Sequence, residues 1–115
     1  MSVSYIPFQF PGLANVRCAF QVRAAIPGGV YRNGYDGGNI SFSTEDAPDI
    51  VTGNRRDLLA ALQPHGLTAW AELNQVHGDV LLFEPEAVAC ETRPTADGDG
   101  MAVSRPGLGL LIKTA

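Results

Sequence analysis

Glycine and proline residues divide this chain into short segments and so restrict what it can fold into. The 115 residues include 13 glycines and 8 prolines, which stay below the level of a disordered composition. They are densest between Ala24 and Asn39, where Pro27-Gly28-Gly29, Asn33-Gly34 and Gly37-Gly38 require turns and permit positive φ angles. We therefore expect a long loop there, and such loops in compact domains are usually functional or mobile.

The apolar pattern predicts strands in the N-terminal half. Residues 15–23 alternate apolar with polar side chains, which is typical of a half-buried strand. Residues 1–12 are apolar and aromatic but are interrupted by Pro7 and Pro11, so they can form at most a short edge strand. Residues 39–43 are a further short strand candidate.

A helix is expected to follow and to end at about Gln63. Thr44-Glu45-Asp46 offers a hydroxyl or acidic cap, and Pro48 stands near the first helical position. Apolar residues then recur on one side at helical spacing: Ile50, Val51, Leu58, Leu59 and Leu62. Gly53 weakens such a helix by about 1 kcal/mol relative to alanine, which indicates close packing or a nearby ligand unless the helix simply tolerates it.

The C-terminal half predicts further strands. Residues 68–75 and 80–83 are two strand candidates, the second running back along the first after His77-Gly78-Asp79. Residues 94–100 are rich in turn formers, and the apolar run at 107–112 is typical of a central strand covered on both faces. We therefore predict a mixed α/β fold with a central mixed β-sheet flanked by helices.

Composition excludes several classes of protein. A chain with 45% hydrophobic residues can bury one modest core, so a single domain is expected. A net charge of -4 leaves no basic stripe for nucleic acid. No apolar run approaches the roughly 20 residues of a membrane-spanning helix, and the N-terminus does not resemble a secretory signal. We expect a soluble, cytoplasmic protein in which Cys18 and Cys90 are free thiols, because they lack C-x-x-C spacing.

One histidine is a candidate metal ligand. His77 stands at a tight turn between the apolar runs of residues 69–80, where strands could hold its ring nitrogens at the edge of a pocket. Zinc needs three or four protein donors and no second histidine stands at ligand spacing, so a structural histidine is the alternative. His65, in a Pro-His-Gly turn, is expected to be a solvated cap.

Arginine side chains are candidate phosphate ligands. Asn54-Arg55-Arg56-Asp57 places two guanidinium groups on adjacent helical positions, so at most one can point toward a site shared with His77. A guanidinium suits a phosphate because it donates two parallel hydrogen bonds. The alternative is an exposed helix face with acidic partners. Arg23, between a strand and the glycine-rich loop, has the same two interpretations.

The remaining motifs are weaker. Asp97-Gly98-Asp99-Gly100 lacks the twelve-position calcium pattern and is interpreted as an aspartate-rich turn. Gly28-Gly29 and Gly107-x-Gly109 match no nucleotide-binding fingerprint, and the nucleophile motif G-x-S-x-G of serine hydrolases is missing from the sequence.

Several short runs nevertheless occur in a telling order: Asn54-Arg55-Arg56, Leu73-Asn74-Gln75-Val76-His77-Gly78, Asp99-Gly100-Met101, Pro106-Gly107 and Lys113-Thr114-Ala115. In this order they resemble the laccase-domain family, whose members were first labelled multicopper polyphenol oxidases and are now described as purine nucleoside phosphorylases with adenosine deaminase side activity. The similarity also takes in Arg23, Gly28-Gly29-Val30 and Asn39, and its most specific part is the run that ends in His77-Gly78.

The resemblance implies a zinc site. In that family the histidine of this run is a zinc ligand, joined by the cysteine of a Thr-Ala-Asp-Cys motif and by a later histidine. His77 matches the first ligand, and Thr114-Ala115 match the first half of the second motif. The sequence thus resembles an N-terminal portion of a family member and is expected to be inactive or self-associating by itself.

The resemblance also implies a reaction. Phosphate would attack the anomeric carbon of adenosine, inosine, guanosine or methylthioadenosine through an oxocarbenium-like state, with deamination of adenosine as a side activity. His77 would then hold the metal, Arg55 or Arg23 would hold phosphate, and Asn39 would be a polar contact from the loop.

Two other interpretations stay open. The chain could be a partly folded interaction module that pairs through an open sheet edge, with His77 purely structural. The older oxidase label could instead hold literally, with copper in place of zinc. Blue-type copper sites need several histidines and a cysteine, which the two histidines of this sequence cannot supply.

Overall fold

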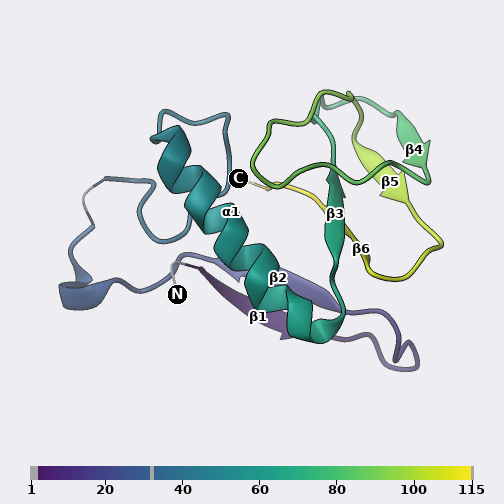
Figure 1. The fold of residues 1–115 in the computed structure, drawn as a ribbon, viewed down its shortest axis with the longest axis horizontal. Helices are drawn as coiled ribbons and strands as arrows, with labels where there is room; N and C mark the ends of the chain where they lie inside the picture. The colour runs from purple at the N-terminus through teal and green to yellow at the C-terminus, as the bar shows by residue number, and fades with distance from the viewer. Residues whose placement is uncertain (1–2, 32, 115) are drawn as a thin grey trace. The chain divides into compact units, whose positions relative to one another are not determined.

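The computed structural model describes residues 3–31 and 33–114 (Figure 1). The chain divides into two compact units, Met1–Leu58 and Leu59–Ala115. Helix α1 (Pro48–Leu62) begins in the first unit and ends in the second. Short strands, one α-helix and two 3-10 helices make up the described regular structure, which confirms the prediction of a mixed α/β fold. The strands lie in three two-stranded sheets rather than in one continuous sheet.

The first unit contains an antiparallel pair of strands, β1 (Ser4–Phe8) and β2 (Cys18–Val22). Both strands were expected, and the edge strand accommodates Pro7. Because opposed and alternate residues share a face, Ile6, Phe8, Phe20 and Val22 form one apolar face. All four are exposed, Phe20 by 59%. The strand is therefore predicted correctly, but the prediction that its apolar side is buried is wrong. Alternation shows which side chains share a face and does not show whether another segment packs on that face.

The loop predicted at residues 24–39 is confirmed over its described residues, 24–31 and 33–39, which contain one 3-10 turn, η1 (Pro27–Gly29). The strand predicted at residues 39–43 is wrong. The carbonyl oxygen of the Asn39 side chain accepts a hydrogen bond from the Ser41 amide at 3.0 Å, and the Thr44 hydroxyl donates to the Ser41 carbonyl at 3.1 Å. Such local bonds from polar side chains compete with strand pairing.

Helix α1 follows its prediction closely. Pro48 is its first residue, where a missing amide hydrogen costs nothing. The helix gives way to η2 (Gln63–His65), and Gly66 ends the turn with a left-handed φ of 98°. The apolar side is buried at Val51 and Leu58. A Cβ at Gly53 would meet no atom within 4 Å, so the interpretation of close packing there is wrong, which leaves a nearby ligand or simple tolerance.

The second unit contains two parallel pairs. β3 (Ala69–Glu72) pairs with β6 (Leu108–Leu111), and β4 (Leu81–Phe83) pairs with β5 (Gly100–Ala102). The prediction that residues 80–83 run back along 68–75 is wrong. The carbonyl of Val80 instead accepts hydrogen bonds from the amides of Asp99 at 3.0 Å and Gly100 at 3.3 Å, so the chain after His77 turns toward β5.

β6 is less covered than its sequence predicts. Among the described strands it pairs with β3 alone, and Leu110 is 38% exposed. The expectation of a central strand covered on both faces is therefore wrong for the described residues. The buried side chains among the described residues of this unit lie in β3, just after it and on the later loop: Trp70, Ala71, Glu72, Leu73, Pro85 and Cys90. In the described part of the chain, no helix has the length and apolar character to cross a membrane.

Candidate functional site

His77 lies in the second unit, in the turn between β3 and β4. Its backbone has a φ of 57°, in the left-handed region that side chains with a Cβ rarely adopt. The residue is exposed, so its imidazole is open to solvent at this turn. The expected presentation of His77 at a tight turn is confirmed.

The carboxylate of Asp99 holds this turn. Its Oδ1 accepts hydrogen bonds from the backbone amides of Val76 at 3.0 Å and His77 at 2.8 Å, and its Oδ2 accepts one from Gly78 at 2.7 Å. Three successive amides therefore converge on one carboxylate. The bond from Gly78 is the largest cause of a lowered pKa for Asp99, against a smaller opposing effect of desolvation; the other two amides and the charge of His77 lower the pKa further.

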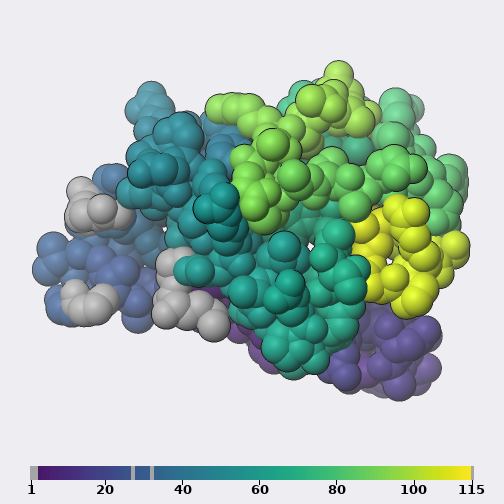
Figure 2. Space-filling view, viewed as in Figure 1, coloured from purple at the N-terminus to yellow at the C-terminus, as the bar shows by residue number. Residues whose placement is uncertain are grey.

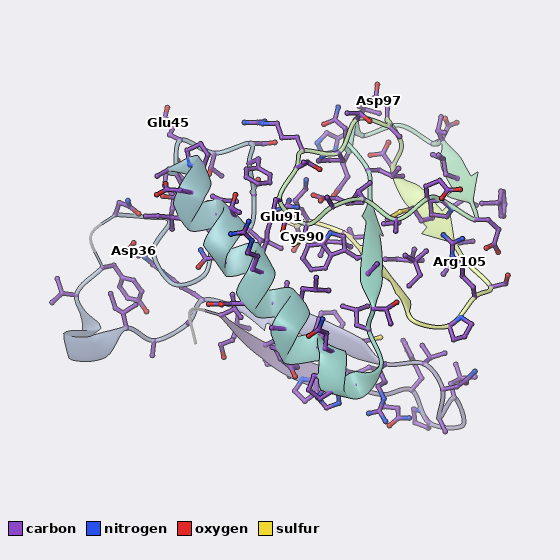
Figure 3. The ribbon with its side chains drawn as sticks, viewed as in Figure 1. Asp36, Glu45, Cys90, Glu91, Asp97 and Arg105 are labelled. Carbon is purple, nitrogen blue, oxygen red and sulfur yellow. The ribbon has the colours of Figure 1, made fainter. Side chains whose placement is uncertain are left out.

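The residues just before His77 are tied to two other segments. Asn74 Nδ2 donates to Asp97 Oδ1 at 2.9 Å, and Asp97 lies on the loop before β5 (Figure 3). The side chain of Gln75 donates to the Lys113 carbonyl at 3.0 Å and accepts from the Lys113 amide at 2.8 Å. Gln75 thus joins the chain beyond β3 to the chain beyond β6 through its side chain. Every polar side chain between Leu73 and His77 is therefore used to fix the approach to the turn.

An ion pair joins the last residue of β3 to the segment that follows β6. Lys113 Nζ is 2.8 Å from Glu72 Oε2, and the Glu72 side chain is fully buried. A buried carboxylate needs such a partner, because an unpaired charge in the interior is costly. This pair fixes the end of β6 against the end of β3, immediately before the turn that carries His77.

The described residues offer no complete donor set for a metal ion. Across residues 3–31 and 33–114, no three His, Cys, Asp or Glu side chains group closely enough to hold a metal ion. His77 can offer one imidazole. His65 is exposed in the 3-10 turn, as expected for a solvated cap. Cys18 is a half-buried free thiol and Cys90 a buried one, which confirms the expectation for both.

Arg55 occupies an unexpected position in the first unit. It is fully buried rather than on an exposed helix face, whereas its neighbour Arg56 is exposed. Arg55 Nε donates to the Ile40 carbonyl at 2.7 Å, and the guanidinium carbon lies 4.5 Å from the centroid of the Phe42 ring. Arg55 therefore anchors the segment that precedes α1.

Asn39 lies beside that anchor. Its backbone carbonyl accepts a hydrogen bond from Asn54 Nδ2 at 2.9 Å. Its side-chain Nδ2 donates to Thr44 Oγ1 at 3.0 Å and to Asp46 Oδ2 at 3.2 Å. The structure thus brings Arg55 and Asn39 together around one turn. The side-chain amide of Asn39 is therefore already hydrogen-bonded within this turn.

Arg23 organises the other part of the loop. Its Nε donates to the Asp36 carbonyl at 2.7 Å, its Nη2 donates to the Asn33 carbonyl at 3.1 Å, and its guanidinium carbon lies 3.6 Å from the Tyr31 ring centroid. Arg23 remains exposed. Of the three predicted polar residues in this unit, it is the one that solvent reaches most openly.

The residues that hold the His77 turn and the segments beside it could not be recognised in the sequence. Asp99, Gln75, Glu72 and Lys113 received no individual role. Their signal was weak, because a carboxylate or amide finds its partner only when segments 21 to 41 residues apart come together. The aspartate-rich run at 97–100 did form the expected turn, and its second aspartate is the one that anchors His77.

A comparison with known protein families covers the residues described above. A family model described as multi-copper polyphenol oxidoreductase laccase matches residues 17–115. This span takes in the His77 turn, Asp99 and the end of β6, together with Arg23, Asn39 and Arg55. No curated relative and no solved structure gives a significant match.

Proposed function

This chain belongs to the multi-copper polyphenol oxidoreductase laccase family, and we propose that its reaction is the zinc-dependent phosphorolysis of purine nucleosides. Adenosine, inosine, guanosine and methylthioadenosine are the proposed substrates, with deamination of adenosine as a side activity. The observation that carries the proposal is the exposed imidazole of His77 on a turn fixed by three hydrogen bonds to Asp99. The side chain of an exposed residue gains no packing that would offset backbone strain, and strained residues cluster at ligand-binding and active sites. An exposed histidine in a strained turn is therefore suited to ligand binding.

His77 fits one position of a zinc site and cannot complete it. Zinc takes three or four protein donors, and the part of the chain that is described groups no such set. The proposal therefore requires further donors from outside the described residues. We expect no nucleoside turnover from a polypeptide that lacks them.

Arg23 is the best candidate for the phosphate contact. Two carbonyls and the Tyr31 ring hold its guanidinium while the residue stays exposed. A guanidinium in fixed orientation can offer paired donors to phosphate oxygens. Arg55 is buried on the Ile40 carbonyl and Asn39 is bonded within its own turn, so we propose that these two shape the loop.

The proposed reaction balances without a further reactant. A phosphate oxygen forms a bond to C1′ of the ribose while the bond from C1′ to the purine nitrogen breaks. The proton that hydrogen phosphate loses passes to the purine, which leaves as the neutral base, and the sugar is released as its 1-phosphate. Holding phosphate in place would make this a positioned reaction rather than a bimolecular encounter.

Metal content and turnover test the proposal together. The longest in-frame polypeptide that contains this sequence should carry stoichiometric zinc and convert inosine and phosphate to hypoxanthine and ribose 1-phosphate. His77→Ala should lose both, and His65→Ala, which changes the other exposed histidine of the same unit, should lose neither. Turnover by a protein free of zinc would contradict the proposal, and copper in place of zinc with oxidation of a phenol would support the oxidase alternative.

A second candidate function is interaction through the apolar face of the first unit. Ile6, Phe8, Phe20 and Val22 are all exposed on one face of the β1–β2 sheet, with the rings of Phe8 and Phe20 6.4 Å apart. The N-terminal segment, purple in Figure 2, reaches the surface in that view. Contiguous exposed apolar side chains of this kind mark interaction surfaces. This candidate predicts self-association that His77→Ala does not change.

A further inference from the structure

The conformation of His77 calls for a stabilising contact. Its φ of 57° places it in the left-handed region, a property that it shares with only one other non-glycine residue in the described part of the chain, Glu84. This conformation is unfavourable for a residue with a Cβ. The exposed side chain of His77 cannot recover that cost by packing.

Asp99 supplies the contact through the backbone. Its two oxygens bind the amide of His77 and the amides on either side of it, those of Val76 and Gly78, at 2.7–3.0 Å. A run of successive amides that converge on one anion is a recurrent anion-binding arrangement of the backbone. Here the anion belongs to the protein, so the arrangement locks the turn rather than binding a ligand.

Asp99 is itself held in place. Its own amide donates to the Val80 carbonyl at 3.0 Å, and the next residue, Gly100, begins β5 beside β4. The carboxylate therefore stands immediately before the paired strand β5 and reaches back to the turn that leads into β4. The position of His77 is thus determined by β4–β5 pairing as well as by β3.

We propose that Asp99 is the positioning residue for His77: by binding the three amides around it, Asp99 keeps His77 left-handed and thereby fixes where its imidazole points. The part of this inference that concerns metal affinity rests on the proposed function. The part that concerns the turn does not. Residues that orient a metal ligand typically change metal affinity by about 10–100-fold when they are removed.

Two measurements on the longest in-frame polypeptide that contains this sequence test the inference. They are the hydrogen exchange of the amides at residues 76–78 and the Kd for zinc. Asp99→Ala should speed exchange at these amides and weaken zinc binding, each by about tenfold or more. Asp79→Ala is the matched control, because Asp79 is an exposed carboxylate beside the same turn, whereas the amides at residues 76–78 donate to Asp99. It should leave both measurements within about twofold of the unsubstituted protein.

The substitution His77→Gly tests whether the left-handed backbone at residue 77 is strained. His77→Gly should raise the denaturation midpoint in the unsubstituted protein, because glycine adopts the left-handed region freely. It should raise the midpoint less in the Asp99→Ala background, where the turn can relax. Asp99→Asn keeps one acceptor oxygen and should give intermediate exchange rates, which provides a measurement if Asp99→Ala does not fold.

The outcomes separate the two proposals. Unchanged exchange at residues 76–78 in Asp99→Ala or Asp99→Asn would overturn the inference about the turn. Faster exchange with unchanged zinc affinity would overturn the positioning role, provided that His77→Ala does lose zinc. If His77→Ala keeps its zinc, the proposed function fails, and the exchange data still decide whether Asp99 holds the turn.

Discussion

At the scale of single residues, burial separates side chains that look alike in the sequence. Arg55 and Arg56 are adjacent and chemically identical, yet Arg55 is fully buried on the Ile40 carbonyl while Arg56 is exposed. Helical geometry predicted that they face different directions but not which one is buried. That choice depends on the segment 39–42, which folds against the helix from outside it.

The two arginines should therefore differ in their contribution to stability. Arg55→Ala removes a charge-assisted hydrogen bond and the packing of a long buried side chain, so we expect the free energy of unfolding to fall by about 2–4 kcal/mol. Arg56→Ala should change it by no more than about 0.5 kcal/mol. Urea denaturation of both variants measures the difference, and equal losses would contradict the assigned role of Arg55.

Asp99 should make stability depend on pH in acid. The pKa of its carboxyl is lowered below the ordinary value of 3.8 when the chain is folded, since Gly78, His77 and Val76 donate to it. The ionised form is thus stabilising above about pH 4, and this contribution is lost as the pH falls through the lower folded pKa. Denaturation midpoints from pH 6 down to the acid limit should fall more steeply for the unsubstituted protein than for Asp99→Asn. Parallel curves would show that the three contacts contribute nothing.

At the scale of elements, local signals were sufficient where an element depends on its own sequence. Helix α1, the loop at 24–39 and the strands at 69–72 and 108–111 all occur where the spacing of apolar residues, glycine and proline placed them. The strand expected at 39–43 failed because polar side chains bond to the nearby backbone. Burial and pairing of the strands could not be predicted, since they depend on distant segments.

Two glycine substitutions of opposite effect test this view of the elements. Gly53→Ala should stabilise the protein by about 1 kcal/mol, because alanine is the better helix former and its Cβ meets no atom within 4 Å. Gly37→Ala should destabilise it. The φ of Gly37 is 102°, and a Cβ there would lie 2.9 Å from the Ala24 carbonyl oxygen. Thermal unfolding of both variants should give shifts of opposite sign, and a loss of stability in Gly53→Ala would contradict the open surroundings of that residue.

At the scale of the whole molecule, the open apolar face of the β1–β2 sheet has a consequence for solution behaviour. Ile6 and Phe20 are opposed in the register and exposed by 57% and 59%. We expect the protein to self-associate with increasing concentration, since burying this face removes apolar surface from water. Sedimentation velocity should detect the association, and the double substitution Ile6→Thr with Phe20→Thr should weaken it. Unchanged association in that variant would place the contact elsewhere.

The candidate site shows the same division between local and distant effects. The sequence alone presented His77 at a turn between strands and placed an aspartate-rich turn at 97–100, because these features follow from local spacing. It did not join them. The contact between Asp99 and the His77 turn spans 22 residues, and the bond from Gln75 to Lys113 spans 38.

The sequence by itself therefore determined which segments are helical, extended or looped, since those preferences act within a few residues of each position. Only the tertiary structure decided which strands pair, which arginine is buried and which carboxylate holds His77. These outcomes depend on hydrogen bonds and packing between segments whose separation along the chain leaves no periodic trace in the sequence.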